Sequence, residues 1–340
     1  MTAFGDREAG VLTDQYEIYN GNANPELARK IAHWLGSEPG RAEVFEFANE
    51  NIFVRILDNV REKDIFLVQP TSRPVNQSIM ELLIMIDAFK RASAGRITAV
   101  VPYYAYGRSD KKDQPRVPIT ARLIADMITV AGADRMLTMD LHQGQIQGFF
   151  NIPVDELTAV HMLSRYFLDR HLEDAVVVTD LGFAKRARAF AELLDVPLAI
   201  VEKRRHGNLD RAEVINVIGE VRDRRVIIID DEIDTAGTLI EITRALEKEG
   251  ARDIYACATH GVLSDPAIDR ISNSNLQEVV ITDTIPLPAH KHIPRIKVLS
   301  VAPLIGEAIK RIHRGESVGA LFSSEVSFTQ EMLLWEDGLA

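Results

Sequence analysis

The 340-residue sequence has a single cysteine, Cys257, in the apolar context YACAT. One cysteine cannot form a disulfide within the chain, so a disulfide scaffold is excluded and a reducing compartment is expected. The sequence also has no run of 18 or more uncharged apolar residues and no apolar stretch at its start, MTAFGDREAG. We therefore expect a cytoplasmic protein with neither a membrane span nor a secretory signal.

A net positive charge is also absent, since 50 Asp and Glu outnumber 39 Lys and Arg and the formal net charge is −11. This balance argues against sequence-independent binding of nucleic acid, which needs a basic surface to displace counterions. The cations that are present form three clusters, each just after a strand-like run: 108–112, 185–188 and 203–205. Such clusters are compatible with binding of a phosphorylated small molecule.

Short apolar runs rich in β-branched residues alternate with helical patterns along the chain. The runs lie at 65–68, 97–101, 176–178, 226–229 and 279–281. They are apolar without alternation, which is typical of parallel strands covered on both faces. The clearest helical stripe, over 78–91, consists of Ile79, Leu82, Leu83, Ile86 and Phe89. This order of elements predicts an α/β architecture with parallel sheets.

The sequence contains an internal repeat. GADRMLTMDLH at 132–142 matches GARDIYACATH at 250–260, and PITARLIADM at 118–127 aligns with AGTLIEITRA at 236–245 on the same offset. The preceding loop is long and basic in the first copy, and short and acidic in the second. The repeat predicts two diverged copies of one α/β unit.

The short acidic loop lies in VIIIDDEIDTAGT, residues 226–238. A strand that looks fully buried ends in Asp230, Asp231 and Asp234, and the chain then enters a helix expected over 238–249. Backbone N–H groups at a helix N-terminus bind anions, and carboxylates accept hydrogen bonds from sugar hydroxyls. The pattern predicts a site for a sugar phosphate. The alternative is an acidic strand end followed by an ordinary N-cap at Thr235.

Several long motifs resemble one enzyme family. VIIIDDEIDTAGT is similar to the phosphoribosyl-diphosphate loop of type I phosphoribosyltransferase folds. PVNQSIMELLIMIDAFKRASAGRITAVVPYYAYGRSD, DLHQGQIQGFFNIPVDEL and EKRR resemble ribose-phosphate diphosphokinase, and the resemblance runs from about residue 18 to 322.

The fold that the resemblance implies is α/β, with two tandem phosphoribosyltransferase-type domains, each a parallel β-sheet flanked by helices. The N-terminal domain would span 11–156, with 308–322 packing on it. The C-terminal domain would span 157–307 and carry the ribose-phosphate loop, and 323–340 would form an additional tail.

The activity that the resemblance implies is transfer of the diphosphate of ATP to O1 of ribose 5-phosphate, for nucleotide biosynthesis, by a Mg²⁺-dependent homohexamer or homodimer. The implied catalytic cations are Lys203 and Arg205, on a mobile loop EKRRHGNLD, and the implied metal positions are His142 and Asp180. The implied ATP contacts are Phe47, Asn49, Glu50, Asn51, Arg108, Ser109 and Asp110. The implied ribose-5-phosphate contacts are Asp230, Asp231, Asp234, Thr235, Ala236, Gly237 and Thr238.

The sequence departs from the family pattern at three places. Residues 47–51 read FANEN where the family has aromatic-x-Asp-Gly-Glu, Phe183 stands where a glycine is usual, and Val117 replaces an acid. These departures leave the nucleotide preference open. Two other functions also stay open: a phosphoribosyltransferase that uses the same acidic loop, and a non-catalytic regulatory homologue.

Overall fold

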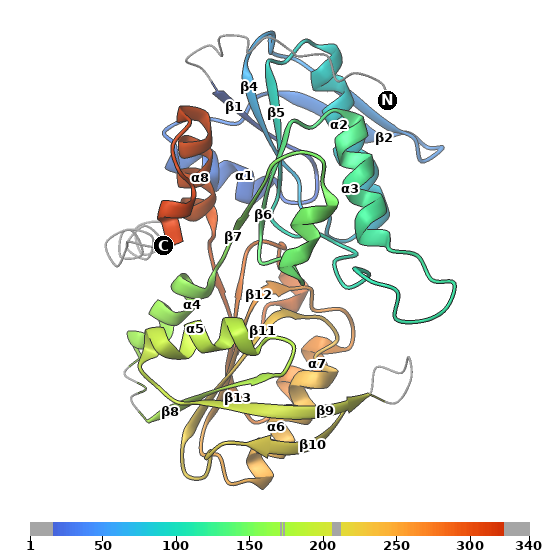
Figure 1. Ribbon diagram of the computed structural model, residues 1–340. Coiled ribbons are helices and arrows are strands. Elements are labelled where there is room, and N and C mark those ends of the chain that lie inside the picture. The colour runs from blue at the N-terminus through green and yellow to red at the C-terminus, as the bar shows by residue number, and fades with distance from the viewer. Residues whose placement is uncertain (1–15, 171, 173, 206–211, 323–340) are drawn as a thin grey trace. The chain divides into compact units, whose positions relative to one another are not determined.

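The computed structural model describes residues 16–322, apart from 171, 173 and 206–211. The described chain divides into two compact units, and each has its own sheet (Figure 1). Unit 1 contains residues 16–157 and 302–322, and unit 2 contains residues 158–301. Among the described residues, no helix is both long enough and apolar enough to cross a membrane.

The sheet of unit 1 has five parallel strands in the order β1-β4-β5-β6-β7. These strands are β1 Tyr16–Asn20, β4 Asp64–Val68, β5 Arg96–Val101, β6 Arg135–Met139 and β7 Val154–Leu157. All five residues of β4 are buried, as expected for a strand covered on both faces. An antiparallel hairpin, β2 Ala42–Glu46 and β3 Ile52–Ile56, stands apart from this sheet.

Helices cover both faces of the first sheet (Figure 1). Helices α2 (Val75–Arg91) and α3 (Thr120–Ala131) pack together on one face, and a short 3₁₀ helix η1 (Gly144–Phe149) contacts α3. Helix α1 (Pro25–Trp34) packs against α8 (Ala302–Arg314), which comes from the far end of the sequence. A Cβ on Gly306 would lie 2.5 Å from the Trp34 ring, so glycine permits this close approach.

A buried carboxylate, Asp64, attaches α8 to the sheet of unit 1. It begins β4, is fully buried and accepts hydrogen bonds from both Nε (2.8 Å) and Nη2 of Arg96 on β5. The His313 Nδ1 lies 2.9 Å from the same carboxylate, and Arg96 also donates to the carbonyl of Ile312 at 3.2 Å. The returning helix is therefore held by a charge cluster as well as by apolar packing.

The sheet of unit 2 has seven strands in the order β10-β9-β8-β11-β12-β13-β14. They are β8 Ala175–Asp180, β9 Leu198–Arg205, β10 Ala212–Ile218, β11 Arg225–Ile233, β12 Ile254–Gly261, β13 Leu276–Thr282 and β14 Ile296–Leu299. Strand β10 pairs antiparallel with β9, so this sheet is mixed rather than wholly parallel as expected. The antiparallel strand lies at an edge, where a hairpin connection adds it without a crossover helix.

The helices of unit 2 follow from its crossovers. They are α4 Val160–Leu168, α5 Ala184–Leu194, α6 Gly237–Lys248 and α7 Ala267–Ser272, followed by the 3₁₀ turn η2 Ala289–Lys291. A further 3₁₀ turn, η3 Gly319–Phe322, belongs to unit 1. The β8–α5–β9 and β11–α6–β12 crossovers run in opposite directions along the sheet. Because such crossovers are right-handed, α5 and α6 lie on opposite faces.

The internal repeat is confirmed by matching topology. The order β4-β5-β6-β7 in unit 1 corresponds to β8-β11-β12-β13 in unit 2, and α3 and α6 occupy equivalent crossovers. An Asp–Arg pair joins the amino ends of the first two strands in each copy. In unit 2 this pair is Asp174 with Arg225, at 2.8 Å between carboxylate oxygen and Nε.

We expect Asp64→Asn to lower the free energy of unfolding by about 3 kcal/mol, because it leaves the partly buried Arg96 without its counter-charge. Urea unfolding of the full chain measures the change. The control is Asp87→Asn, which breaks an i,i+4 pair with Arg91 on the exposed side of α2 and should leave the midpoint unchanged. Equal effects of the two substitutions would contradict this account of Asp64.

Candidate active site

The sheet of unit 2 has a topological switch point between β8 and β11. These strands are parallel neighbours, and the chain leaves their carboxyl ends in opposite directions along the sheet. Open α/β sheets bind ligands in the crevice at such a point. Asp180 and Asp230 each lie two residues beyond the last paired residues, Val178 and Ile228. The structure therefore brings Asp180 and the acidic loop to the carboxyl ends of two neighbouring strands of one sheet.

The acidic loop continues the pairing of β11 with β12 after β8 has diverged. Asp230 and Ile233 still pair with β12, while the Asp231 side chain is only 5% exposed. The Asp231 backbone N–H donates to Oδ1 of Asp230 at 2.9 Å. The two adjacent carboxylates are thus held on a strand, with little freedom to separate.

The turn after the acidic loop leads directly into α6. Ala236 is the N-cap residue, in the left-handed conformation with φ 57°, and its methyl side chain makes no capping hydrogen bond. The reading of Thr235 as an ordinary N-cap is therefore wrong. Because the N-cap residue offers no side-chain acceptor to the first N–H groups of α6, this helix start suits an anion.

Residues distant in the sequence support this turn and the strand end before it. Nη1 of Arg270, on α7, donates to the carbonyl of Thr235 at 2.8 Å. The N–H of Leu263 donates to the carbonyl of Ile233 at 3.0 Å, and the buried Lys291 Nζ donates to the Leu263 carbonyl at 2.6 Å. These residues are distant in the sequence and carry no motif.

The start of α5 fixes the side chain of Asp180. Its Oδ1 accepts a hydrogen bond of 3.1 Å from the backbone N–H of Phe183, the N-cap residue of that helix. Phe183 is only 8% exposed, and the Arg186 guanidinium lies 5.7 Å from the centre of its ring. The phenyl ring therefore occupies space at the start of α5.

In unit 1, the predicted nucleotide-binding stretch 108–110 lies beside His142. A Cβ on Gly107 would lie 3.4 Å from Cβ of His142, so the loops after β5 and β6 are in close contact. The Ser109 side chain bonds the start of α3, where its Oγ accepts a hydrogen bond of 3.3 Å from the Thr120 N–H. Arg108 is exposed and Asp110 is partly buried.

Residues 47–51 form the exposed tip of the β2–β3 hairpin. Phe47 packs against Phe45 and Phe53, with ring centroids 5.1 and 5.8 Å away, yet it remains 47% exposed. The Asn49 side chain accepts from the Asn51 N–H at 3.2 Å and so stabilises the turn. The tip therefore presents an aromatic surface outward.

The predicted catalytic cations end strand β9. Lys203 and Arg205 pair through their backbones with Val214 and Ala212 of β10. Residues 202–205 are thus strand rather than the expected loop, because the backbone of β10 satisfies their hydrogen bonds. The rest of that predicted loop, and the side chains of Lys203 and Arg205, lie outside the described part of the structure.

The predicted metal positions belong to different units, His142 to unit 1 and Asp180 to unit 2. Within residues 16–205 and 212–322, leaving out 171 and 173, no group of three or more His, Cys, Asp or Glu side chains could hold a metal ion. A carboxylate such as Asp180 is a ligand type that Mg²⁺ prefers, usually with waters and substrate phosphates completing the shell.

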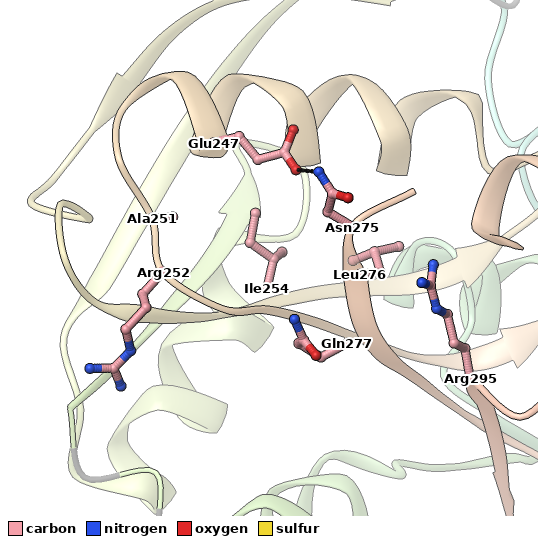
Figure 2. A pocket seen from close by; sticks show the side chains of 8 residues that line it. All are labelled: Glu247, Ala251, Arg252, Ile254, Asn275, Leu276, Gln277 and Arg295. Carbon is pink, nitrogen blue, oxygen red and sulfur yellow. Dashed lines mark hydrogen bonds between the residues drawn. The ribbon is translucent and has the colours of Figure 1, made fainter. Parts of the chain in front are cut away.

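A pocket of about 640 Å³ lies at the amino ends of β12 and β13 in unit 2 (Figure 2). Its lining consists of Glu247, Ala251, Arg252, Ile254, Asn275, Leu276, Gln277 and Arg295. Its charged groups already have protein partners: Glu247 bonds Asn275 at 2.5 Å, and Arg252 pairs with Asp174 at 2.7 Å. The pocket contains none of the predicted site residues, so we place the candidate site at the carboxyl ends of β8 and β11.

Known proteins match both units of the chain. Residues 16–132 match the N-terminal domain of ribose phosphate pyrophosphokinase, and residues 209–323 match the phosphoribosyl synthetase-associated domain. A ribose-phosphate pyrophosphokinase from Caldanaerobacter subterraneus subsp. tengcongensis is 56% identical over 92% of this chain and 99% of its own length. The chain belongs to the ribose-phosphate pyrophosphokinase family.

Other members of the family agree. The chloroplastic ribose-phosphate pyrophosphokinase 2 of Arabidopsis thaliana is 48% identical over 90% of this chain and 77% of its own. The crystal structure of phosphoribosylpyrophosphate synthetase from Mycobacterium smegmatis superposes with a TM-score of 0.83 and 43% identity, covering 88% of this chain and 99% of that one. The predicted fold, enzyme class and activity are confirmed: this is a ribose-phosphate pyrophosphokinase with two phosphoribosyltransferase-like units.

Two departures from the family pattern have visible structural consequences. Glu50 occupies the hairpin position at which the pattern has glycine, and it takes a left-handed φ of 66°. Such a conformation costs an L-residue about 1 kcal/mol, which glycine would not lose. Phe183 replaces the second glycine after Asp180, and its ring is buried rather than turned out to solvent.

Cys257 lies on β12 directly opposite Ile229 of β11, behind the acidic loop. Burial, and secondly the charge of Asp230, raise the pKa of its thiol. Only the thiolate is nucleophilic, so this pyrophosphokinase should not react with a thiol reagent at pH 8 while folded. Unfolding in urea should release one reactive thiol per chain, and Cys257→Ser should abolish that signal. Rapid labelling of the native enzyme would contradict the buried placement.

Proposed function

We propose that this pyrophosphokinase binds ribose 5-phosphate at the switch point of unit 2 and transfers to its O1 the diphosphate of ATP, releasing AMP. One observation carries the assignment: the acidic loop adjoins the start of α6, whose N-cap residue is an alanine, at the carboxyl end of β11. Carboxylates that accept from hydroxyls, followed directly by N–H groups that receive an anion, match the two ends of a sugar phosphate.

The acceptor contacts divide along the loop. Asp230 and Asp231 accept hydrogen bonds from ribose hydroxyls; both lie on β11, where Asp230 pairs with Ala258 of β12. Residues 234–238, Asp234 to Thr238, surround the 5-phosphate with backbone N–H groups and the two threonine hydroxyls. Because the loop is fixed before substrate arrives, little ordering energy is lost on binding.

The donor contacts come from two exposed segments. Phe47 provides an aromatic wall for the adenine, supported by Phe45 and Phe53. Asn49, Glu50 and Asn51 accompany it at the tip, and Arg108, with Ser109 and Asp110, contacts the nucleotide. The hairpin tip stands outward, which suits a contribution to the site of a neighbouring subunit in a homohexamer or its homodimer building block.

The charge at the switch point is negative and must be balanced when phosphates bind. Bound Mg²⁺ would supply that balance and neutralise charge developing on the transferred diphosphate. Asp180 fits it as an oxygen ligand oriented by the Phe183 N–H, and His142 is the second proposed position. Lys203 and Arg205 at the end of β9 are the proposed catalytic cations. The cytoplasm, which holds both substrates, is the proposed compartment.

We expect Asp231→Asn to raise KM for ribose 5-phosphate about tenfold, because a charge-assisted hydrogen bond to a sugar hydroxyl becomes a neutral one. KM for ATP should change less than twofold in the same steady-state assay. Asp253→Asn, a partly exposed acid just before β12 at the other edge of the sheet, is the charge-matched control. A parallel rise of both Michaelis constants would remove Asp231 from the acceptor site.

Mixing two inactive variants tests the shared site. Phe47→Ala and Lys203→Ala should each lack activity alone. Their mixed oligomers should regain part of it, since some sites would combine an intact Phe47 with an intact Lys203. A mixture of Lys203→Ala with Arg205→Ala is the matched control and should stay inactive. Subunit exchange verified with tagged chains, but without recovered turnover, would show that each site is built from one chain.

A further inference from the structure

Arg270 lies behind the acceptor loop, on the short helix α7. Its Nη1 donates to the carbonyl of Thr235 at 2.8 Å, and the side chain is partly buried. Thr235 directly precedes Ala236, the residue at which the chain turns into α6. We infer that Arg270 is a positioning residue for ribose 5-phosphate binding. The inference rests on the proposed assignment of residues 234–238 to the 5-phosphate.

The peptide between Thr235 and Ala236 explains how a distant arginine acts on an anion. In a planar trans peptide the C=O and the N–H point in opposite directions. Because Arg270 holds the Thr235 oxygen toward α7, the Ala236 N–H is directed away from α7. Ala236 is left-handed and Gly237 begins the helix, and successive N–H groups in such a sequence converge on one point. Arg270 thus sets the direction of the first donor in that row.

The peptide between Thr235 and Ala236 adjoins a strained residue, so its orientation needs support. Ala236 has φ 57°, a conformation that L-residues avoid, and it is 4% exposed, so the loop cannot relax outward. If the peptide rotated to relieve the strain, the Thr235 oxygen would face the phosphate and repel it. A charged donor on that oxygen opposes the rotation, because charge-assisted hydrogen bonds are stronger than neutral ones. The guanidinium charge also lies behind the loop, where it attracts the phosphate.

The second support of the loop acts elsewhere. Leu263, itself bonded to Lys291, donates to the carbonyl of Ile233, the last residue of β11. That contact fixes the end of the strand, whereas Arg270 fixes the turn two residues later. The Arg270 guanidinium bonds backbone rather than substrate, so it is not a catalytic residue.

The test is steady-state kinetics of the full-length enzyme carrying Arg270→Gln or Arg270→Lys. Arg270→Gln should raise KM for ribose 5-phosphate about tenfold, the effect of losing one charge-assisted hydrogen bond. KM for ATP and kcat should change less than twofold. Arg270→Lys should recover part of the loss, because an ammonium group can still donate one bond to the carbonyl. Thermal protection by ribose 5-phosphate alone should weaken in the same order.

Arg295 provides the matched control. It also donates from Nη1 to backbone carbonyls, but to those of Ile271 and Ser272 at the carboxyl end of α7 and of Ser274 just after it, not to the acceptor loop. Arg295→Gln should leave KM for ribose 5-phosphate unchanged even if it lowers the melting temperature. An equal rise of that constant in both glutamine variants would reduce Arg270 to a general structural role and overturn the inference.

A failure of the inference can be separated from a failure of the site assignment. Thr238→Ala changes a proposed phosphate contact directly. If Thr238→Ala raises KM for ribose 5-phosphate and folded Arg270→Gln does not, the inference about Arg270 is wrong and the site stands. If neither raises it, the acceptor assignment is wrong and the inference falls with it. Should Arg270→Gln not fold, Arg270→Lys decides, since a rise of both Michaelis constants together would overturn selective positioning.

Discussion

The parallel pairing of β11 with β12 is the interaction on which the candidate site depends. It continues through Ile233, although the pairing of β11 with β8 ends at Ile228. The last residues of β11 are therefore paired with β12 on one side and lie beyond the pairing with β8 on the other. Asp230 and Asp231 are adjacent on this strand end, and the Asp231 N–H donates to Oδ1 of Asp230. On the proposed assignment, their like charges are tolerated because ribose hydroxyls donate hydrogen bonds to them and bound Mg²⁺ would balance the negative charge.

Support for that strand end comes from elements outside the motif. Leu263 and Lys291 fix the strand, Arg270 fixes the turn, and the apolar core of unit 2 lies directly behind both. Fixed dipoles aimed at a substrate need no reorganisation when it binds, which is the physical advantage of placing charged groups on a rigid strand. The strain at Ala236 is stored where the surrounding contacts determine the backbone completely.

The two copies of the unit show how one scaffold was used for two tasks. Both keep the Asp–Arg pair at the amino ends of their first two strands. They differ at the carboxyl ends, where the first has a long basic loop and the second a short acidic one. In unit 1 the pair gained a third partner, His313, which attaches the returning helix α8. The shared ion pair thus lies at the amino ends of the strands, whereas the two copies differ at the carboxyl ends.

Local sequence patterns predicted much of the fold. The buried strands, the α2 stripe, the repeat and the acidic loop were all readable from the sequence, because strand burial and helix periodicity are properties of neighbouring residues. Family motifs added the activity, which full-length relatives confirm. Tertiary structure alone decided that β10 closes the second sheet antiparallel, and that Lys203 and Arg205 extend a strand. It also decided that Ala236, not Thr235, is the N-cap residue of α6, and that Arg270 bonds the carbonyl of Thr235. These features depend on contacts between residues far apart in sequence, and such contacts leave no periodicity for a sequence to show.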